Sequence, residues 1–196
     1  SVSGLKGAAP AYLLSRIAPR VRAPILFLAP DETRAEQRAE EIHFFLDPLR
    51  EVLLYPSWDV NPFQNISPSP EVMGQRWEAR HALSRPGADL CLVSSLAAVL
   101  EKVPPREVSR RFALELAPGR EFQREDFISR LQGLGYTRVH AVAQKGEFAV
   151  RGFLLDVFSP ASAQPLRIEF FGDRVESVRN FDPDTQRSLR DLPDAA

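Results

Sequence analysis

One stretch in the last third of the chain decides the fold of its second half: Pro165-Leu166-Arg167-Ile168-Glu169-Phe170-Phe171-Gly172-Asp173. Apolar and polar residues alternate along it, which is the pattern of a strand with one buried face and one open face. The alternation predicts three side chains that point into a core: Leu166, Ile168 and Phe170. Arg167, Glu169 and Phe171 then share the opposite face.

That opposite face has the composition of a protein-binding surface. A large aromatic side chain beside an arginine is typical of an interaction hot spot. Arg151 precedes Gly152 at a predicted turn between strands and can reach the same face as Arg167 and Phe171. These three residues are therefore candidate contact residues. A structural alternative stays open, in which Phe171 folds over the strand end and Arg167 pairs with Glu169.

Further strand patterns surround this stretch. Residues 138–150, 153–158 and 174–181 read as strands joined by short connections, which favour antiparallel pairing. A helix is expected over 123–134, with Phe127, Ile128 and Leu131 on its apolar side. The second half is therefore predicted to be a small α+β domain with an antiparallel sheet.

The first half of the chain has a different pattern of apolar residues. Apolar runs at 24–29, 52–55 and 90–93 alternate with helical patterns, which predicts a parallel sheet covered by helices. The continuous run 24–29 predicts a strand buried on both faces. Proline, asparagine and serine make 56–70 irregular. The fold class is thus α/β, with a parallel α/β domain over 1–107 and the α+β domain over 108–185.

Composition sets limits on function. The 196 residues carry a net charge of −1, which argues against a strong nucleic-acid binding surface. The single cysteine, Cys91, cannot form an internal disulfide, as expected in the cytoplasm. No apolar run approaches membrane-spanning length, and no membrane association is expected.

A glycine-containing loop precedes the first helix: Gly4-Leu5-Lys6-Gly7-Ala8-Ala9-Pro10-Ala11. A working phosphate-binding loop has the form G-x-x-x-x-G-K-[ST]. Here Ala9, Pro10 and Ala11 replace the second glycine, the lysine and the hydroxyl residue, and Pro10 also removes a backbone donor. An ordinary loop and a phosphate loop that has lost its chemistry both remain open. Neither is expected to bind ATP.

No other constellation points to chemistry. His43, His81 and His140 have no metal-ligand spacing, and Cys91 has no partner cysteine. We therefore predict no catalytic residue, no metal site and no cofactor.

Several segments in order resemble the domain shared by the excision-repair protein UvrB and the transcription-repair coupling factor family: 146–158, 166–173, 175–177 and 181–186. The segments 54–59, 61–63 and 67–70 resemble the coupling factors in particular. The resemblance covers essentially the whole chain.

The resemblance implies that the first domain is a degenerate helicase-like domain. UvrB has an intact phosphate loop and a long DNA-gripping hairpin, whereas 59–71 is too short here to hold that hairpin. It also implies that the second domain binds UvrA, and the family's contact positions fall on Arg151, Arg167 and Phe171. Residues 186–196 would begin a segment that returns to the first domain.

The function that the resemblance implies is a non-catalytic docking module that recruits UvrA to stalled RNA polymerase in transcription-coupled nucleotide excision repair. The longer protein would also bind RNA polymerase and double-stranded DNA as an ATP-driven translocase. The alternative is a fragment of a UvrB-type, ATP-dependent damage-verification helicase, against which Pro10 and Ala11 argue. A direct DNA-binding module is a third class, which the net charge disfavours.

Overall fold

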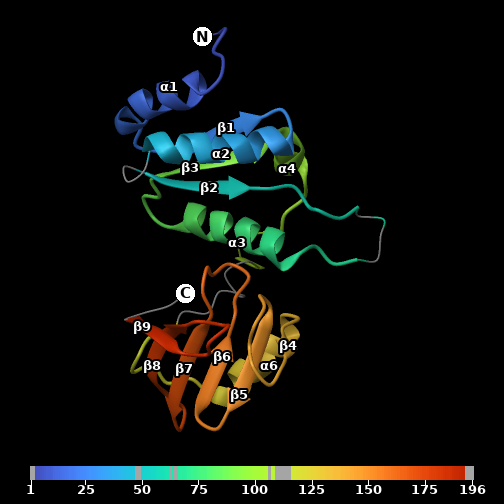
Figure 1. Ribbon diagram of the computed structural model, residues 1–196, viewed down its shortest axis with the longest axis vertical. Coiled ribbons are helices and arrows are strands. Elements are labelled where there is room, and N and C mark those ends of the chain that lie inside the picture. The colour runs from blue at the N-terminus through green and yellow to red at the C-terminus, as the bar shows by residue number, and fades with distance from the viewer. Residues whose placement is uncertain are drawn as a thin grey trace. The chain divides into compact units, whose positions relative to one another are not determined.

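The computed structural model describes residues 3–46, 50–61, 63, 66–105, 107–108 and 116–192. The chain divides into two compact units, 1–103 and 104–196. Each unit has its own sheet (Figure 1).

The sheet of the first unit is parallel, as predicted. Its strands are β1 (Ile25–Ala29), β2 (Glu51–Tyr55) and β3 (Leu90–Ser95), in the order β1-β3-β2. All six residues of the central strand β3 are buried. A strand that is covered on both faces needs a continuous apolar run, and 90–93 supplies one.

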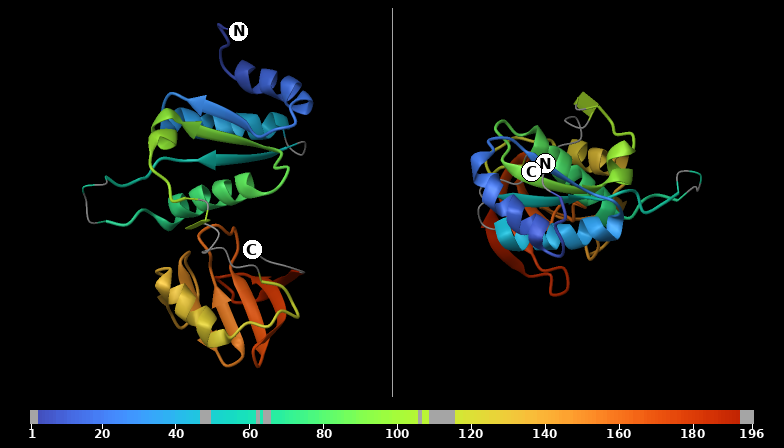
Figure 2. Two further views of the ribbon diagram at one scale, coloured as in Figure 1. Left: turned by 180° about the vertical axis from the view of Figure 1, so that it is seen from behind. Right: turned by 90° about the horizontal axis from the view of Figure 1, so that it is seen from above.

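Helices cover both faces of this sheet (Figure 2). One apolar cluster joins the sheet to α1 (Ala9–Ile17) and α2 (Glu32–Leu46). A second cluster joins it to α3 (Pro70–Ser84) and α4 (Leu96–Leu100). A short 3-10 helix, Ala18–Arg20, continues α1. No helix in the described residues combines the length and apolar character that crossing a membrane requires.

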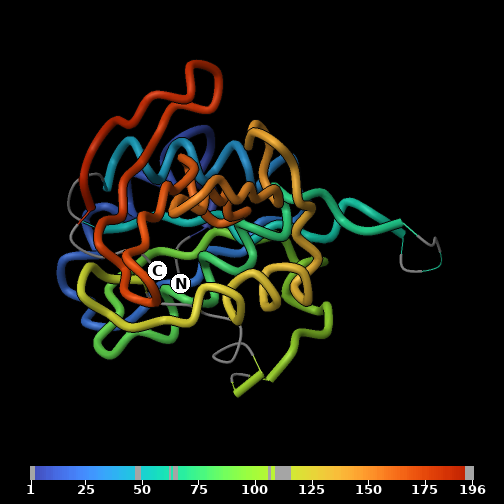
Figure 3. Tube along the Cα trace, turned by 90° about the horizontal axis from the view of Figure 1, so that it is seen from below, coloured from blue at the N-terminus to red at the C-terminus, as the bar shows by residue number. Residues whose placement is uncertain are grey.

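The irregular segment between β2 and α3 ends at a helix cap. The Ser69 hydroxyl accepts from the Val72 amide at 3.3 Å, and the Ser69 amide donates to the Asp59 carboxylate at 3.2 Å. The described residues between 56 and 69 form neither helix nor strand, as the sequence predicts. Figure 3 shows the described residues of this segment projecting from the first unit.

The prediction that the strand at 24–29 is buried on both faces is wrong. Ile25, Phe27 and Ala29 pack towards the cluster with α1 and α2, but Leu26 and Leu28 on the other face are half-exposed. The strand β1 lies at the edge of the sheet, and α3 packs on β2 and β3 instead. Composition alone does not distinguish an edge strand from a central one.

The second unit has a mixed sheet in which antiparallel pairing dominates. The pairs from β5 to β9 are antiparallel, and β4 runs parallel to β5. The order is sequential, from β4 to β9. The strands are β4 (Thr137–Arg138), β5 (Glu147–Arg151), β6 (Leu154–Val157), β7 (Leu166–Phe171), β8 (Arg174–Phe181) and β9 (Ser188–Leu192).

Two segments differ from the expectation. The predicted strand 138–150 is two short parallel strands, because a loop that ends at Gly146, with φ of +82°, separates them. Residues 188–192, which fall within the segment 186–196 that is expected to return to the first domain, form β9 beside β8. Residues 193–196 lie outside the described part, so that return stays a prediction.

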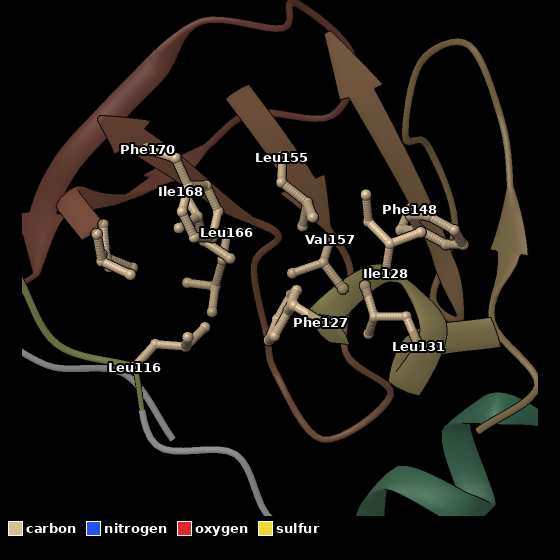
Figure 4. Packing of buried hydrophobic residues seen from close by; sticks show 12 residues of the cluster. Leu116, Phe127, Ile128, Leu131, Phe148, Leu155, Val157, Leu166, Ile168 and Phe170 are labelled. Carbon is tan, nitrogen blue, oxygen red and sulfur yellow. The ribbon is translucent and has the colours of Figure 1, made fainter. Parts of the chain in front are cut away.

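Within the described residues of the second unit, the helix that packs on this sheet is α6 (Arg124–Gly133), which covers one face. Figure 4 shows Phe127, Ile128 and Leu131 of α6 pointing towards the buried strand residues. Leu166, Ile168 and Phe170 are all in this core, which confirms the predicted alternation. The fold class is therefore α/β as expected, with a parallel sheet followed by a largely antiparallel one.

Candidate functional site

The face of the second sheet opposite α6 carries the three candidate residues. Phe171 ends β7 and is 77% exposed, so it does not fold over the strand end. Arg167 lies four positions earlier on β7, on the same side of the alternation as Glu169 and Phe171. Arg151 ends β5, two strands away.

A buried aspartate on the strand between them joins the two arginines. Asp156 on β6 lies opposite Arg167 on β7 and opposite Ala149 on β5. Arg167 Nε donates to Asp156 Oδ1 at 2.8 Å, and its Nη2 donates to Oδ2 at 2.9 Å. Arg151 Nη2 also donates to Oδ2. One fully buried carboxylate therefore holds two guanidinium groups.

Arg167 is engaged mainly within the protein. Its Nη1 donates to the Gln186 carbonyl at 3.0 Å, and its guanidinium lies 4.5 Å from the centre of the Phe181 ring. Only 11% of its side chain is exposed. The hydrogen bond to Asp156 raises the pKa of Arg167 further, so its positive charge is permanent. It is therefore fixed in place more firmly than an open-face residue would be.

The Arg151 side chain contacts Asp156 with one edge and is exposed to solvent with the other. Its side chain is 43% exposed despite the ion pair with Asp156. The following residue, Gly152, makes the turn into β6 with φ of +58°, a conformation that side chains disfavour. Two arginines and one aspartate leave a net charge of +1 at this place, since 2 − 1 = 1. Arg151 presents that charge to solvent.

The alternative pairing of Arg167 with Glu169 is wrong. Glu169 pairs with Arg179 of β8, and the Ser177 hydroxyl donates to the same carboxylate at 3.2 Å. Arg167 pairs with Asp156 instead. The pattern along one strand does not reveal the ion pairs of Asp156, because its partners come from the neighbouring strands. The available signal was a lone carboxylate in the apolar run Leu154-Leu155-Asp156-Val157.

The loop that resembles a phosphate loop is tied to the protein itself. Gly4 and Gly7 have positive φ, and the chain enters α1 with Pro10 in the first turn. Arg38 of α2 donates to the Gly7 carbonyl at 2.6 Å and also pairs with Glu41. A carbonyl that faces an arginine is a poor phosphate cradle, because a phosphate loop binds with amide donors.

The carboxyl edge of β2 is also filled by protein side chains. Parallel sheets usually bind ligands at this edge. Here the buried Arg76 guanidinium stacks 4.4 Å from the centre of the Tyr55 ring and 4.0 Å from that of Trp58. Its Nη1 donates to the Pro56 carbonyl and pairs with Glu101, both at 2.6 Å. The arrangement stabilises the unit and presents no reactive group.

The remaining candidate groups are the Cys91 thiol and the side chains that could hold a metal ion. Burial raises the pKa of the Cys91 thiol to about 11, so the thiol is not a nucleophile at neutral pH. Within the described residues, no three His, Cys, Asp or Glu side chains gather into a possible metal site.

Comparison with known proteins bears on the whole site. A family model described as the UvrB interaction domain matches residues 114–196. The transcription-repair-coupling factor of Myxococcus xanthus is 39% identical over 191 residues, covering 95% of this chain. Those of Escherichia coli K12 and Bacillus subtilis 168 are 32% and 31% identical, covering 96% and 97% of this chain.

The chain belongs to the transcription-repair coupling factor family. The resemblance noted in the sequence is thereby confirmed. The chain spans only 16% of the length of each of these three coupling factors. Arg151, Asp156, Arg167 and Phe171 all lie within the residues that match the UvrB interaction domain.

Proposed function

We propose that the second unit docks UvrA through Arg151, Arg167 and Phe171. The observation that carries this proposal is an exposed phenylalanine at the end of β7 and a partly exposed, pre-positioned arginine at the end of β5, both inside the match to a UvrB interaction domain. Phenylalanine can fill an apolar pocket of the partner, and arginine can bind a carboxylate with two hydrogen bonds.

The buried pairing supports the docking role because it orders the arginines before binding. Arg151 has its guanidinium anchored at one edge by Asp156. A side chain that is already ordered loses less conformational entropy when a partner binds. Arg167 contributes in two ways under this proposal: it holds Asp156 in place, and it offers its small exposed edge to UvrA.

The wider role follows from the family. In a longer coupling factor, this module would bring UvrA to RNA polymerase stalled at a lesion, in transcription-coupled nucleotide excision repair in the cytoplasm. Binding of RNA polymerase and double-stranded DNA, and ATP-driven translocation, would belong to other parts of that protein. The filled strand edge at Arg76 and the loop with Ala9, Pro10 and Ala11 support a non-catalytic role for this segment.

Binding of UvrA to the 196-residue chain tests the proposal directly. We expect Arg151→Ala and Phe171→Ala each to weaken binding by roughly 1–3 kcal/mol, the range for interface anchors. Arg138→Ala is the matched control, because Arg138 is an exposed arginine of the same sheet on β4. Affinity can be measured by biolayer interferometry with immobilised UvrA. Unchanged binding in both variants would place the docking surface elsewhere.

A further inference from the structure

A second exposed phenylalanine lies at the tip of the β5–β6 hairpin. Phe153 is 71% exposed, close to the value for Phe171. Within the described residues 116–192, Phe153 and Phe171 are the phenylalanine, tyrosine or tryptophan side chains that lie mostly in solvent, and the others are at least partly buried. Single exposed apolar residues are common, so the meaning of Phe153 depends on what lies near it.

The backbone brings the two phenylalanines to the same end of the sheet. The Phe170 amide donates to the Phe153 carbonyl at 2.9 Å, so Phe153 lies beside the last residues of β7. Figure 1 shows the β5–β6 and β7–β8 hairpins turning at the same end. Arg151 is two residues before Phe153, across the turn at Gly152. One end of the sheet thus presents Arg151, Phe153 and Phe171.

The hairpin tip that carries Phe153 is braced. Arg124 at the start of α6 donates from Nη1 to the Gly152 carbonyl at 2.6 Å. The Asp156 ion pair holds Arg151 on the other side of the turn. A turn whose backbone is braced loses less conformational entropy when a partner binds, which favours its use in an interface.

We infer that Phe153 is a further docking residue of the surface that contains Arg151 and Phe171, and that it binds the same partner. The inference rests on the proposed function and deepens it. The occupant it implies is UvrA, through a region that combines an apolar pocket with a carboxylate. The pocket receives Phe153 and Phe171, and the carboxylate meets the exposed edge of Arg151. Continuity with Arg151 and Phe171 assigns the occupant.

The test uses the intact 196-residue chain and purified UvrA. Phe153→Ala is expected to weaken binding about tenfold, as for a buried aromatic anchor. Phe153→Leu keeps an apolar side chain and is expected to stay within about threefold of the unsubstituted chain. Phe44→Ala is the matched control, since Phe44 is 78% exposed but lies on α2 of the first unit. Thermal melting should be the same for all of these proteins, because neither ring is buried.

Three binding results overturn the inference. If Phe153→Ala binds UvrA within about twofold of the unsubstituted chain while Arg151→Ala and Phe171→Ala bind weakly, Phe153 lies outside the docking surface and the proposed function stands. If none of the three variants weakens binding, the proposed function fails as well. A Phe44→Ala loss equal to that of Phe153→Ala would show a nonspecific effect and also overturn the inference.

A second copy of the chain could bind the hairpin tip instead of UvrA, and this alternative is tested separately. Sedimentation velocity of the chain alone should show a monomer whose behaviour is unchanged by Phe153→Ala. A dimer that Phe153→Ala dissociates would assign the tip to self-association and contradict the inference.

Discussion

The strands β3 and β7 both have a neighbouring strand on each side, but they differ in how many of their side chains are buried. Every residue of β3 is buried, because helices cover both faces of the first sheet. In β7 the burial alternates, because α6 covers one face only. A sheet covered on both faces stabilises a unit but has no open face to bind with. The sheet on which α6 packs keeps charged and aromatic side chains on its other face, where they can meet a partner.

The largest effect is expected in the core beneath α6. Phe148→Ala should lower the free energy of unfolding of the second unit by about 3–5 kcal/mol, because it removes a fully buried ring. Phe171→Ala is the matched control on the open face and should cost less than about 0.5 kcal/mol. Urea denaturation followed by circular dichroism measures both. Similar losses in the two variants would show that the two faces are not as different as described.

A smaller loss is expected for the arginine that the aspartate holds most firmly. Arg167→Ala should cost about 2–3 kcal/mol, because it removes a bidentate partner from the buried Asp156 while Arg151 still compensates. Arg167 thus affects stability although its side chain lies on the face opposite α6, because of its ion pair with Asp156. Arg151→Ala, with its more exposed side chain, should cost less than about 1 kcal/mol. Urea denaturation measures both losses. A larger loss of stability in Arg151→Ala than in Arg167→Ala would contradict the finding that Asp156 is held mainly by Arg167.

The smallest effect is expected when nucleotide is added to the protein. Millimolar Mg²⁺–ATP should leave the melting temperature unchanged to within about 1 °C, because a ligand stabilises a protein only when it binds the folded state. ATP binding is not expected because the Gly7 carbonyl accepts a hydrogen bond from Arg38, and because Pro10 in the first turn of α1 has no amide hydrogen to donate to a phosphate. Differential scanning fluorimetry, with Mg²⁺ alone as the control, measures it. A clear upward shift would restore the ATP-dependent alternative.

The sequence predicts what depends on local periodicity and misses what depends on neighbours. Alternation along 166–171 correctly placed Phe170 in the core and Phe171 outside it. The same reasoning failed at Leu26, because burial of an edge strand depends on which helix lies above it. The role of Asp156 could not be predicted either. It requires the register between β6 and β7, which an eight-residue connection from Phe158 to Pro165 leaves undetermined in the sequence.

Site-specific photo-cross-linking tests the central claim that UvrA docks on the open face of the second sheet. Benzoylphenylalanine would replace Phe171 on that face or Gln132 on α6, both exposed positions of the second unit. Irradiation with UvrA is followed by gel electrophoresis and mass spectrometry of the product. The account predicts a cross-link to UvrA from position 171 and none from position 132. A cross-link from position 132 alone would contradict it.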